Sequence, residues 1–165
     1  MRILITGSSD GLGLLTARLL SPTHQIVLHA RNPTRATHAS QSCPRAHATV
    51  IGDLSTLAGI RAFALEADKH GPYDCIMHNA GLYLGPVDPG WVKTKMGGEN
   101  AMDDLDAAVE TFGMVCTGEG EAGRKEVGHW YQKREREFRE EARDVETQEK
   151  LLKILEGISG VKVPE

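Results

Sequence analysis

The sequence predicts an α/β protein built on a parallel sheet, and three observations support that class. Short apolar runs typical of buried strands recur in the first half of the chain, at residues 2–6, 25–29, 49–51 and 74–78. Apolar residues at helical spacing separate them at residues 11–20 and 55–70. Glycine or proline follows most of these segments. Strands that alternate with helices in this way form a parallel sheet with crossover helices on its faces.

The two helices predicted in the first half have recognisable ends. Residues 11–20 keep their apolar side chains on one face, and Pro22 ends the helix. Residues 55–70 repeat that spacing after Ser55, the predicted N-cap, and Gly71 provides the stop. Both helices therefore have an apolar face to pack against the sheet.

The second half is predicted to contain a loop followed by helices. Residues 103–112 have apolar residues on one face. Residues 133–141 mix both signs of charge and are predicted to form a solvated helix face. An apolar stripe predicts a last helix that ends at Gly157 or Gly160 and packs on the core, rather than offering a groove to a partner. The members of that stripe are Val145, Gln148, Leu151, Leu152, Leu155 and Ile158.

Composition restricts the class of protein further. The chain has 165 residues, a formal net charge of −4 and 40% hydrophobic residues, which is typical of one soluble domain over residues 1–165. The acidic balance argues against a nucleic-acid partner, and the lack of a run of about 20 apolar residues argues against a membrane span. The three cysteines have no CxxC spacing, and neither they nor the seven histidines show metal-ligand spacing. We therefore expect a cytoplasmic protein with reduced thiols and no metal.

A glycine-rich turn joins the first strand to the first helix, with the sequence Thr6-Gly7-Ser8-Ser9-Asp10-Gly11-Leu12-Gly13. We expect Gly7 to permit a sharp turn, Gly11 to let the backbone approach a pyrophosphate, and Gly13 to let the helix pack closely. The helix N-terminus then offers N–H groups to the phosphates. An accidental glycine-rich turn is the alternative, and the flanking strand and helix argue against it. Residues 1–81 are therefore predicted to be the nucleotide-binding half of a Rossmann-like doubly wound sheet, with the loop and helices of residues 82–165 after it.

The turn after the second strand, His29-Ala30-Arg31-Asn32, bears on the choice of dinucleotide. Sites for NAD commonly have Asp or Glu here to bind the ribose hydroxyls. Arg31 instead offers a guanidinium that can pair with a 2′-phosphate. The sequence therefore favours NADP(H) over NAD(H), and a solvated surface arginine is the alternative.

Several motifs, in this order, resemble those of the short-chain dehydrogenase/reductase family of Rossmann-fold oxidoreductases. The spacing Thr6-Gly7-x-x-x-Gly11-x-Gly13 is similar to the glycine motif of that family, and Asp53-Leu54 resembles the position of its Asp that contacts the adenine ring. His78-Asn79-Ala80-Gly81 resembles its Asn-Asn-Ala-Gly motif, with His in the first place. Pro89-Gly90-Trp91-Val92-x-Thr94 resembles the Pro-Gly loop that follows its sixth strand. Gly128-His129-Trp130-Tyr131 resembles its last strand.

The resemblance implies a nicotinamide dinucleotide as cofactor and a small carbonyl or alcohol as substrate. Pro89 and Gly90 would flank the nicotinamide, and Thr94 would contact its carboxamide or the phosphates. The cofactor-binding residues implied by the motifs are Gly7, Ser9, Asp10, Gly11, Leu12, Gly13, Arg31, Asp53, Leu54, Asn79, Ala80, Gly81, Pro89, Gly90, Val92 and Thr94.

The chain departs from the family between the third and fourth motifs. In the family a long segment separates them and carries the catalytic Asn, Ser and Tyr-x-x-x-Lys, whereas only residues 82–88 lie between Gly81 and Pro89 here. None of the tyrosines has a lysine four positions later, since Tyr73, Tyr83 and Tyr131 are followed there by Met77, Val87 and Glu135. The sequence therefore resembles an internally truncated member that keeps strands one to four and a C-terminal helical part.

Three functions remain open at this point. The chain is an NADP(H)-dependent oxidoreductase by ancestry, a cofactor-binding pseudoenzyme, or a truncated product without function. Family reduction needs a positioned proton donor, and only His78, Tyr83 and Thr94 lie near enough in sequence to replace the missing tyrosine. We assign no catalytic residue, since a surface tyrosine is the simpler account of Tyr83. Neither the substrate nor the oligomeric state follows from the sequence.

Overall fold

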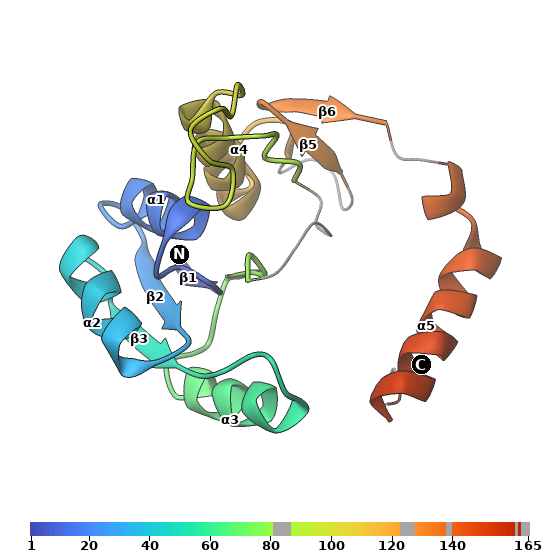
Figure 1. Ribbon diagram of the computed structural model, residues 1–165, viewed down its shortest axis with the longest axis horizontal. Helices are drawn as coiled ribbons and strands as arrows, with labels where there is room; N and C mark the ends of the chain where they lie inside the picture. The colour runs from blue at the N-terminus through green and yellow to red at the C-terminus, as the bar shows by residue number, and fades with distance from the viewer. Residues whose placement is uncertain (81–86, 123–127, 138–139, 161, 163–165) are drawn as a thin grey trace. The chain divides into compact units, whose positions relative to one another are not determined.

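The computed structural model describes residues 1–80, 87–122, 128–137, 140–160 and 162 (Figure 1). Contacts divide the chain into two units, Met1–Glu135 and Arg136–Glu165. The first unit begins with an alternation of strands and helices: β1 (Arg2–Ile5), α1 (Gly11–Leu20), β2 (Gln25–Ala30), α2 (Pro33–Ser42), β3 (Ala48–Ile51), α3 (Leu57–Asp68) and β4 (Cys75–Met77). It continues with α4 (Leu105–Thr117), β5 (His129–Tyr131) and β6 (Arg134–Arg136), whose last residue belongs to the second unit.

The first four strands form one parallel sheet in the order β3-β2-β1-β4. β1 lies in the middle, with Ile3 paired to Ile26 of β2 on one side and to Cys75 of β4 on the other. This confirms the α/β, Rossmann-like class. β4 is the last strand of this sheet among the described residues, and Ile76 in it is 49% exposed. Among the described residues, the β4 side of the sheet is therefore an open edge.

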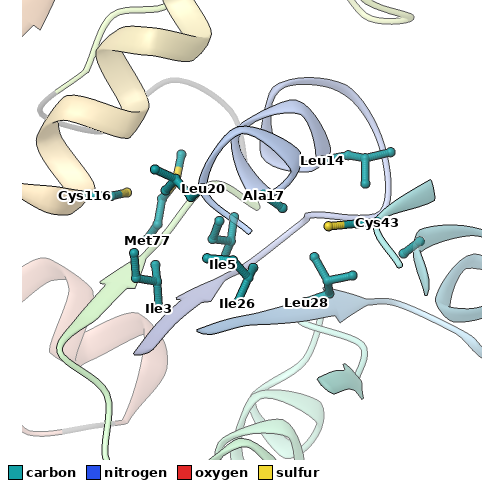
Figure 2. Packing of buried hydrophobic residues seen from close by; sticks show 11 residues of the cluster. Ile3, Ile5, Leu14, Ala17, Leu20, Ile26, Leu28, Cys43, Met77 and Cys116 are labelled. Atoms are coloured by element: carbon teal, nitrogen blue, oxygen red, sulfur yellow. The ribbon is translucent and has the colours of Figure 1, made fainter. Parts of the chain in front are cut away.

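Helices cover both faces of the sheet because successive strand residues point to opposite sides. Ile3 and Ile5 face α1 and α2, whereas Leu4 between them faces α3. The first cluster also includes Met77 of β4 and Cys116 of α4, so α4 packs on the same side as α1 (Figure 2). Figure 1 shows the same layers, with α1 and α2 on one side of the sheet and α3 on the other. None of the described helices has the length and apolar character needed to cross a bilayer.

The structure corrects the predicted elements of the first half in two places. The helix α2 was not predicted, because its sequence PTRATHASQS contains no large apolar residue. Asn32 caps it by accepting a hydrogen bond from the Arg35 N–H, and only Ala36 and Ala39 are buried. The N-cap of α3 is Thr56 rather than Ser55, because the Thr56 side chain accepts the Gly59 N–H at 3.0 Å.

Of the helix predicted at residues 133–141, residues 133–137 do not form a helix. β6 instead pairs with β5 in a small separate sheet, and a turn joins the two strands. Gln132 and Lys133 both have positive φ in that turn, which is incompatible with a helix start. The Lys133 N–H donates to Thr111 Oγ1 of α4 at 2.9 Å, so a contact distant in sequence fixes the turn.

The second unit contains a short 3₁₀ turn, η2 (Glu140–Ala142), and the helix α5 (Val145–Ser159). Asp144 caps the start of α5, and Gly160 ends it in the left-handed conformation, as the sequence predicted. No residue of α5 is buried within this unit, and the predicted packing of α5 on the core stays a prediction. Ile158, at 80% exposed, is the extreme case.

Candidate cofactor site

Gly7 begins the turn that leads from β1 to α1. Its φ is +66°, a conformation that favours glycine, and an added Cβ would lie 3.0 Å from Ala80 Cα. The glycine therefore lets the turn after β1 and the segment after β4 touch. This contact brings the first and third sequence motifs together at the carboxyl edge of the sheet, where ligands bind in open α/β folds.

Gly11 and Gly13 have different surroundings in the first turn of α1. A Cβ on Gly13 would lie 2.5 Å from Asn79 Nδ2 and 2.8 Å from the Gly7 carbonyl oxygen, so the close packing predicted at Gly13 is present. Gly11 has φ +54° and no atom within 4 Å of the Cβ position. The space beside Gly11 is therefore open at a helix N-terminus, where N–H groups without helical partners face outward.

Asn79 and Thr6 connect β4 to the glycine turn. The Thr6 hydroxyl oxygen accepts the N–H groups of Asn79 at 2.9 Å and Ala80 at 3.0 Å. Asn79 Nδ2 in turn donates to the Thr6 carbonyl at 3.0 Å and to the Gly7 carbonyl at 3.3 Å. Within the described structure, Asn79 thus holds the end of β4 against the glycine turn. Gly81, the last residue of that motif, lies outside the described residues.

Arg31 and Asp53 lie close enough at the ends of β2 and β3 to interact electrostatically. Both side chains are exposed. The pKa of Asp53 lies below its ordinary value, mainly because its carboxylate accepts the Ser55 N–H, and the positive charge of Arg31 lowers it further. Leu54 packs beside the second core cluster. The guanidinium and the carboxylate are thus available to groups that approach this edge.

His29 is a site residue whose role sequence reasoning missed. It is 4% exposed, and its Nδ1 accepts the Gly7 N–H at 2.8 Å. Its Nε2 lies 2.9 Å from the Gly52 carbonyl oxygen, and its own N–H donates to Ser8 Oγ at 2.8 Å. The ring therefore joins the turn after β1 to the loop after β3. Its place in an apolar strand, two residues before Arg31, was the only sequence signal.

The Pro-Gly loop is held by Asp103. This carboxylate accepts the Trp91 N–H at 2.5 Å and the Tyr131 hydroxyl at 2.8 Å. Gly90 has φ +72°, and a Cβ there would lie 2.6 Å from the same carboxylate. Val92 is buried and pairs with Asp103 through a single bridge. Asp103 was not predicted, because nothing in the sequence connects a carboxylate at this distance to the loop.

The Pro-Gly loop meets the glycine turn at one ion pair. Lys95 Nζ lies 2.5 Å from Asp10 Oδ2, and Asp10 also caps α1 by accepting the Gly11 N–H at 2.9 Å. The bond from Lys95 is the main reason why the pKa of Asp10 is lowered. Thr94, predicted to face the cofactor, accepts the Gly97 N–H at 3.1 Å and so shapes the loop itself.

Most predicted site residues therefore lie along one edge of the first unit. Ser9 is buried in the glycine turn and Leu12 is half-buried in α1, while Pro89 is half-buried beside Gly90. His78, considered as a substitute proton donor, is exposed at the end of β4. Tyr83, the other candidate, lies outside the described residues.

Comparison with known families agrees with this geometry. The profile described as short chain dehydrogenase matches residues 1–93, which include the glycine turn and most of the Pro-Gly motif. The chain belongs to the short chain dehydrogenase family. Membership in this oxidoreductase family implies a nicotinamide dinucleotide as the cofactor. The residues at the edge fit such a group, because Gly11 leaves an open space at a helix N-terminus.

Three relatives show how much of the chain the family covers. The uncharacterized oxidoreductase AN7799 of Emericella nidulans is 29% identical over 252 aligned positions, which take in 99% of each chain. Short-chain dehydrogenase chry4 of Gibberella zeae is 48% identical over 86 residues, or 52% of this chain and 33% of that protein. Carbonyl reductase (NADPH) 1 of Macaca fascicularis is 34% identical over 94 residues, again 52% of this chain and 33% of that protein. In the last two alignments the chain thus spans a third of its relative's length.

Proposed function

We propose that this chain binds NADP(H) at the carboxyl edge of its four-stranded sheet and lacks the proton donor with which the family reduces carbonyl groups. The open space beside Gly11, at the N-terminus of α1, is the observation on which the proposal rests. Gly7, Gly11, Leu12 and Gly13 would surround the pyrophosphate. The substrate class, a small carbonyl or alcohol, remains an expectation drawn from the family.

Arg31 supports the preference for NADP(H) over NAD(H). It is exposed at the end of β2 and interacts with Asp53 at the end of β3, where the adenosine ribose of a bound dinucleotide would lie. A guanidinium there can form a bidentate pair with a 2′-phosphate. The name of the related carbonyl reductase, which contains NADPH, is consistent with this preference.

The proposal that the chain is internally truncated rests on sequence. No tyrosine has a lysine four positions later, and only residues 82–88 separate the two motifs that normally flank the catalytic segment. The alignment with the Emericella protein has 252 positions, more than the 165 residues of this chain, so it contains a long gap in this chain. A bound nicotinamide would supply hydride chemistry, but the proton donor of the family, the tyrosine of Tyr-x-x-x-Lys, is absent from this sequence.

Calorimetric titration of the purified chain with NADPH and NADH tests the proposed function. We expect NADPH to bind more tightly, by about tenfold or more, since a charge-assisted pair is worth roughly 1.5–3 kcal/mol. Arg31→Ala should abolish most of that preference. Arg45→Ala is the matched control, because Arg45 is an exposed arginine near the start of β3, at the other edge of the sheet.

Two results would contradict the proposal. Binding of NADH as tight as that of NADPH, unchanged by Arg31→Ala, would remove the cofactor preference. Steady oxidation of NADPH in the presence of small aldehydes or ketones would show that another group replaces the missing tyrosine, and the pseudoenzyme account would then be wrong.

A further inference from the structure

His29 lies on the side of β2 that faces α3. Its ring centroid is 4.6 Å from that of Phe63, in an edge-to-face arrangement. Gly52, whose carbonyl the ring contacts, also packs on Phe63, because a Cβ there would lie 2.6 Å from Phe63 Cβ. The loop after β3 is therefore held between the imidazole and the phenyl ring.

The partners of the ring fix its protonation state. The Gly7 N–H can only donate, so Nδ1 must carry a free lone pair to accept it at 2.8 Å. The Gly52 carbonyl oxygen can only accept, so Nε2 must carry the hydrogen across the 2.9 Å contact. His29 is thus a neutral imidazole in a single tautomer, and burial lowers its pKa below the ordinary value.

The two glycines that His29 contacts begin the two loops that would hold a dinucleotide. Gly7 opens the turn that ends at the N-terminus of α1, where the pyrophosphate would lie. Gly52 precedes Asp53, which resembles the adenine-contacting Asp of the family. An imidazole with one acceptor and one donor on opposite sides joins these loops by two hydrogen bonds.

We propose that His29 is a positioning residue for dinucleotide binding, which holds the glycine turn and the Asp53 loop in register through its neutral Nε2–H tautomer. The inference rests on the proposed NADP(H) site and goes beyond it by assigning a buried residue that does not touch the cofactor. Proton uptake at Nδ1 would point an N–H at the Gly7 N–H, so protonation of His29 and cofactor binding oppose each other.

The groups that form hydrogen bonds or an aromatic contact with the ring are uncharged, namely Gly7, Gly52 and Phe63. The charged side chains on the elements around the ring are all at least partly exposed to solvent, and they are Arg2, Asp10, Arg31, Asp53, Arg61, Glu66 and Asp68. The pKa of His29 is lowered by burial, and the Gly52 carbonyl raises it only in part.

The experiment compares wild type with His29→Asn and His29→Phe. The Asn side chain presents an oxygen where Nδ1 lies and keeps the acceptor for the Gly7 N–H, whereas Phe keeps the ring and loses both hydrogen bonds. His47→Asn is the control, because His47 is exposed and lies beside the start of β3 at the opposite edge. Binding of NADP⁺ is measured by calorimetry between pH 5 and 8, and thermal melts report folding of each variant.

We expect His29→Phe to weaken NADP⁺ binding by about tenfold, the order of effect expected when a buried N–H loses its acceptor. His29→Asn should recover part of that loss. Wild-type binding should weaken as the pH falls below the pKa of His29, itself below 6.5. The 2′-phosphate also titrates near pH 6, so the informative quantity is the pH dependence that wild type shows and His29→Asn lacks.

The outcomes separate this inference from the proposed function. If wild type binds NADP⁺ and a folded His29→Phe or His29→Asn binds with the same affinity at every pH, the positioning role is overturned. If His29→Phe does not melt cooperatively, His29→Asn alone is compared with wild type. Equal affinity of these two proteins for NADP⁺ at every pH would then overturn the positioning role. If wild type binds neither NADP⁺ nor NADPH, the proposed function fails first and the role of His29 fails with it.

Discussion

The glycine turn after β1 and the Pro-Gly loop are both predicted parts of one site, and they are held in different ways. The glycine turn is fixed by close backbone contacts, in which Gly7 touches Ala80 and Gly13 touches Asn79. The Pro-Gly loop is held chiefly by a side chain from farther along the chain, the carboxylate of Asp103, and its Lys95 forms an exposed ion pair with Asp10. The shape of the glycine turn therefore depends on residues without a side chain, whereas the shape of the Pro-Gly loop depends on a charged side chain.

The largest effect is expected where the backbone contact is closest. Gly13→Ala places a Cβ 2.5 Å from Asn79 Nδ2, and we expect the free energy of unfolding to fall by about 3 kcal/mol, the upper range for overpacking. Urea denaturation measures this value. Gly157→Ala is the control, because nothing lies within 4 Å of its Cβ position and alanine favours a helix. A loss below about 0.5 kcal/mol at Gly13 would show that the turn adjusts easily.

The next effect concerns the anchor of the Pro-Gly loop. Asp103→Ala removes the acceptor of the Trp91 N–H and the Tyr131 hydroxyl, and we expect a loss of about 2 kcal/mol because hydrogen bonds to charged groups are involved. Tyr131→Phe should lose about 1 kcal/mol, since it removes one neutral donor. Urea denaturation, followed by the intrinsic fluorescence of Trp91 and Trp130, measures both losses. Equal losses in the two variants would mean that the bond to Trp91 contributes nothing.

A third effect is the pH dependence of stability that His29 is expected to cause. The pKa of His29 is lowered in the folded chain by burial, so below pH 6.5 the unfolded chain takes up a proton that the folded chain does not. Stability should therefore be complete above 6.5 and decline as the pH falls through the folded pKa, by about 1.4 kcal/mol per unit of difference. Urea denaturation from pH 5 to 8 should show this slope in wild type and not in His29→Asn. A slope that remains in the variant would assign it to another group.

The smallest effect is expected at the contact between the two loops. Lys95 is 83% exposed and Asp10 34%, so solvent screens the pair, and Lys95→Ala should change the free energy of unfolding by less than about 0.5 kcal/mol. Its effect on NADP(H) affinity should be larger at low salt than at high salt. A loss of stability near that of Asp103→Ala would show that the ion pair, and not Asp103, holds the loop.

The sequence predicts what local chemistry determines. The strand and helix pattern of the first half and the steric role of Gly13 follow from periodicity and spacing, and the structure contains both. The sequence does not predict roles that depend on contacts between residues far apart in the chain. His29 occupies an ordinary strand position, and its role appears only when Gly7 and Gly52 are placed around its ring. The helix α2 was missed because its buried face consists of alanines, and the helix predicted at 133–141 was wrong because a contact with Thr111 fixes a turn instead.

Thermal unfolding of the purified chain, with and without each cofactor, tests directly whether the edge with the glycine turn binds NADP(H). We expect a cooperative transition that NADPH raises more than NADH, with about 2.7 kcal/mol of added stability at a hundred times the dissociation constant. Arg31→Ala should bring the two shifts together. A transition that neither cofactor moves, at concentrations of several millimolar, would contradict the account, because it would show that the edge with the glycine turn does not bind a dinucleotide.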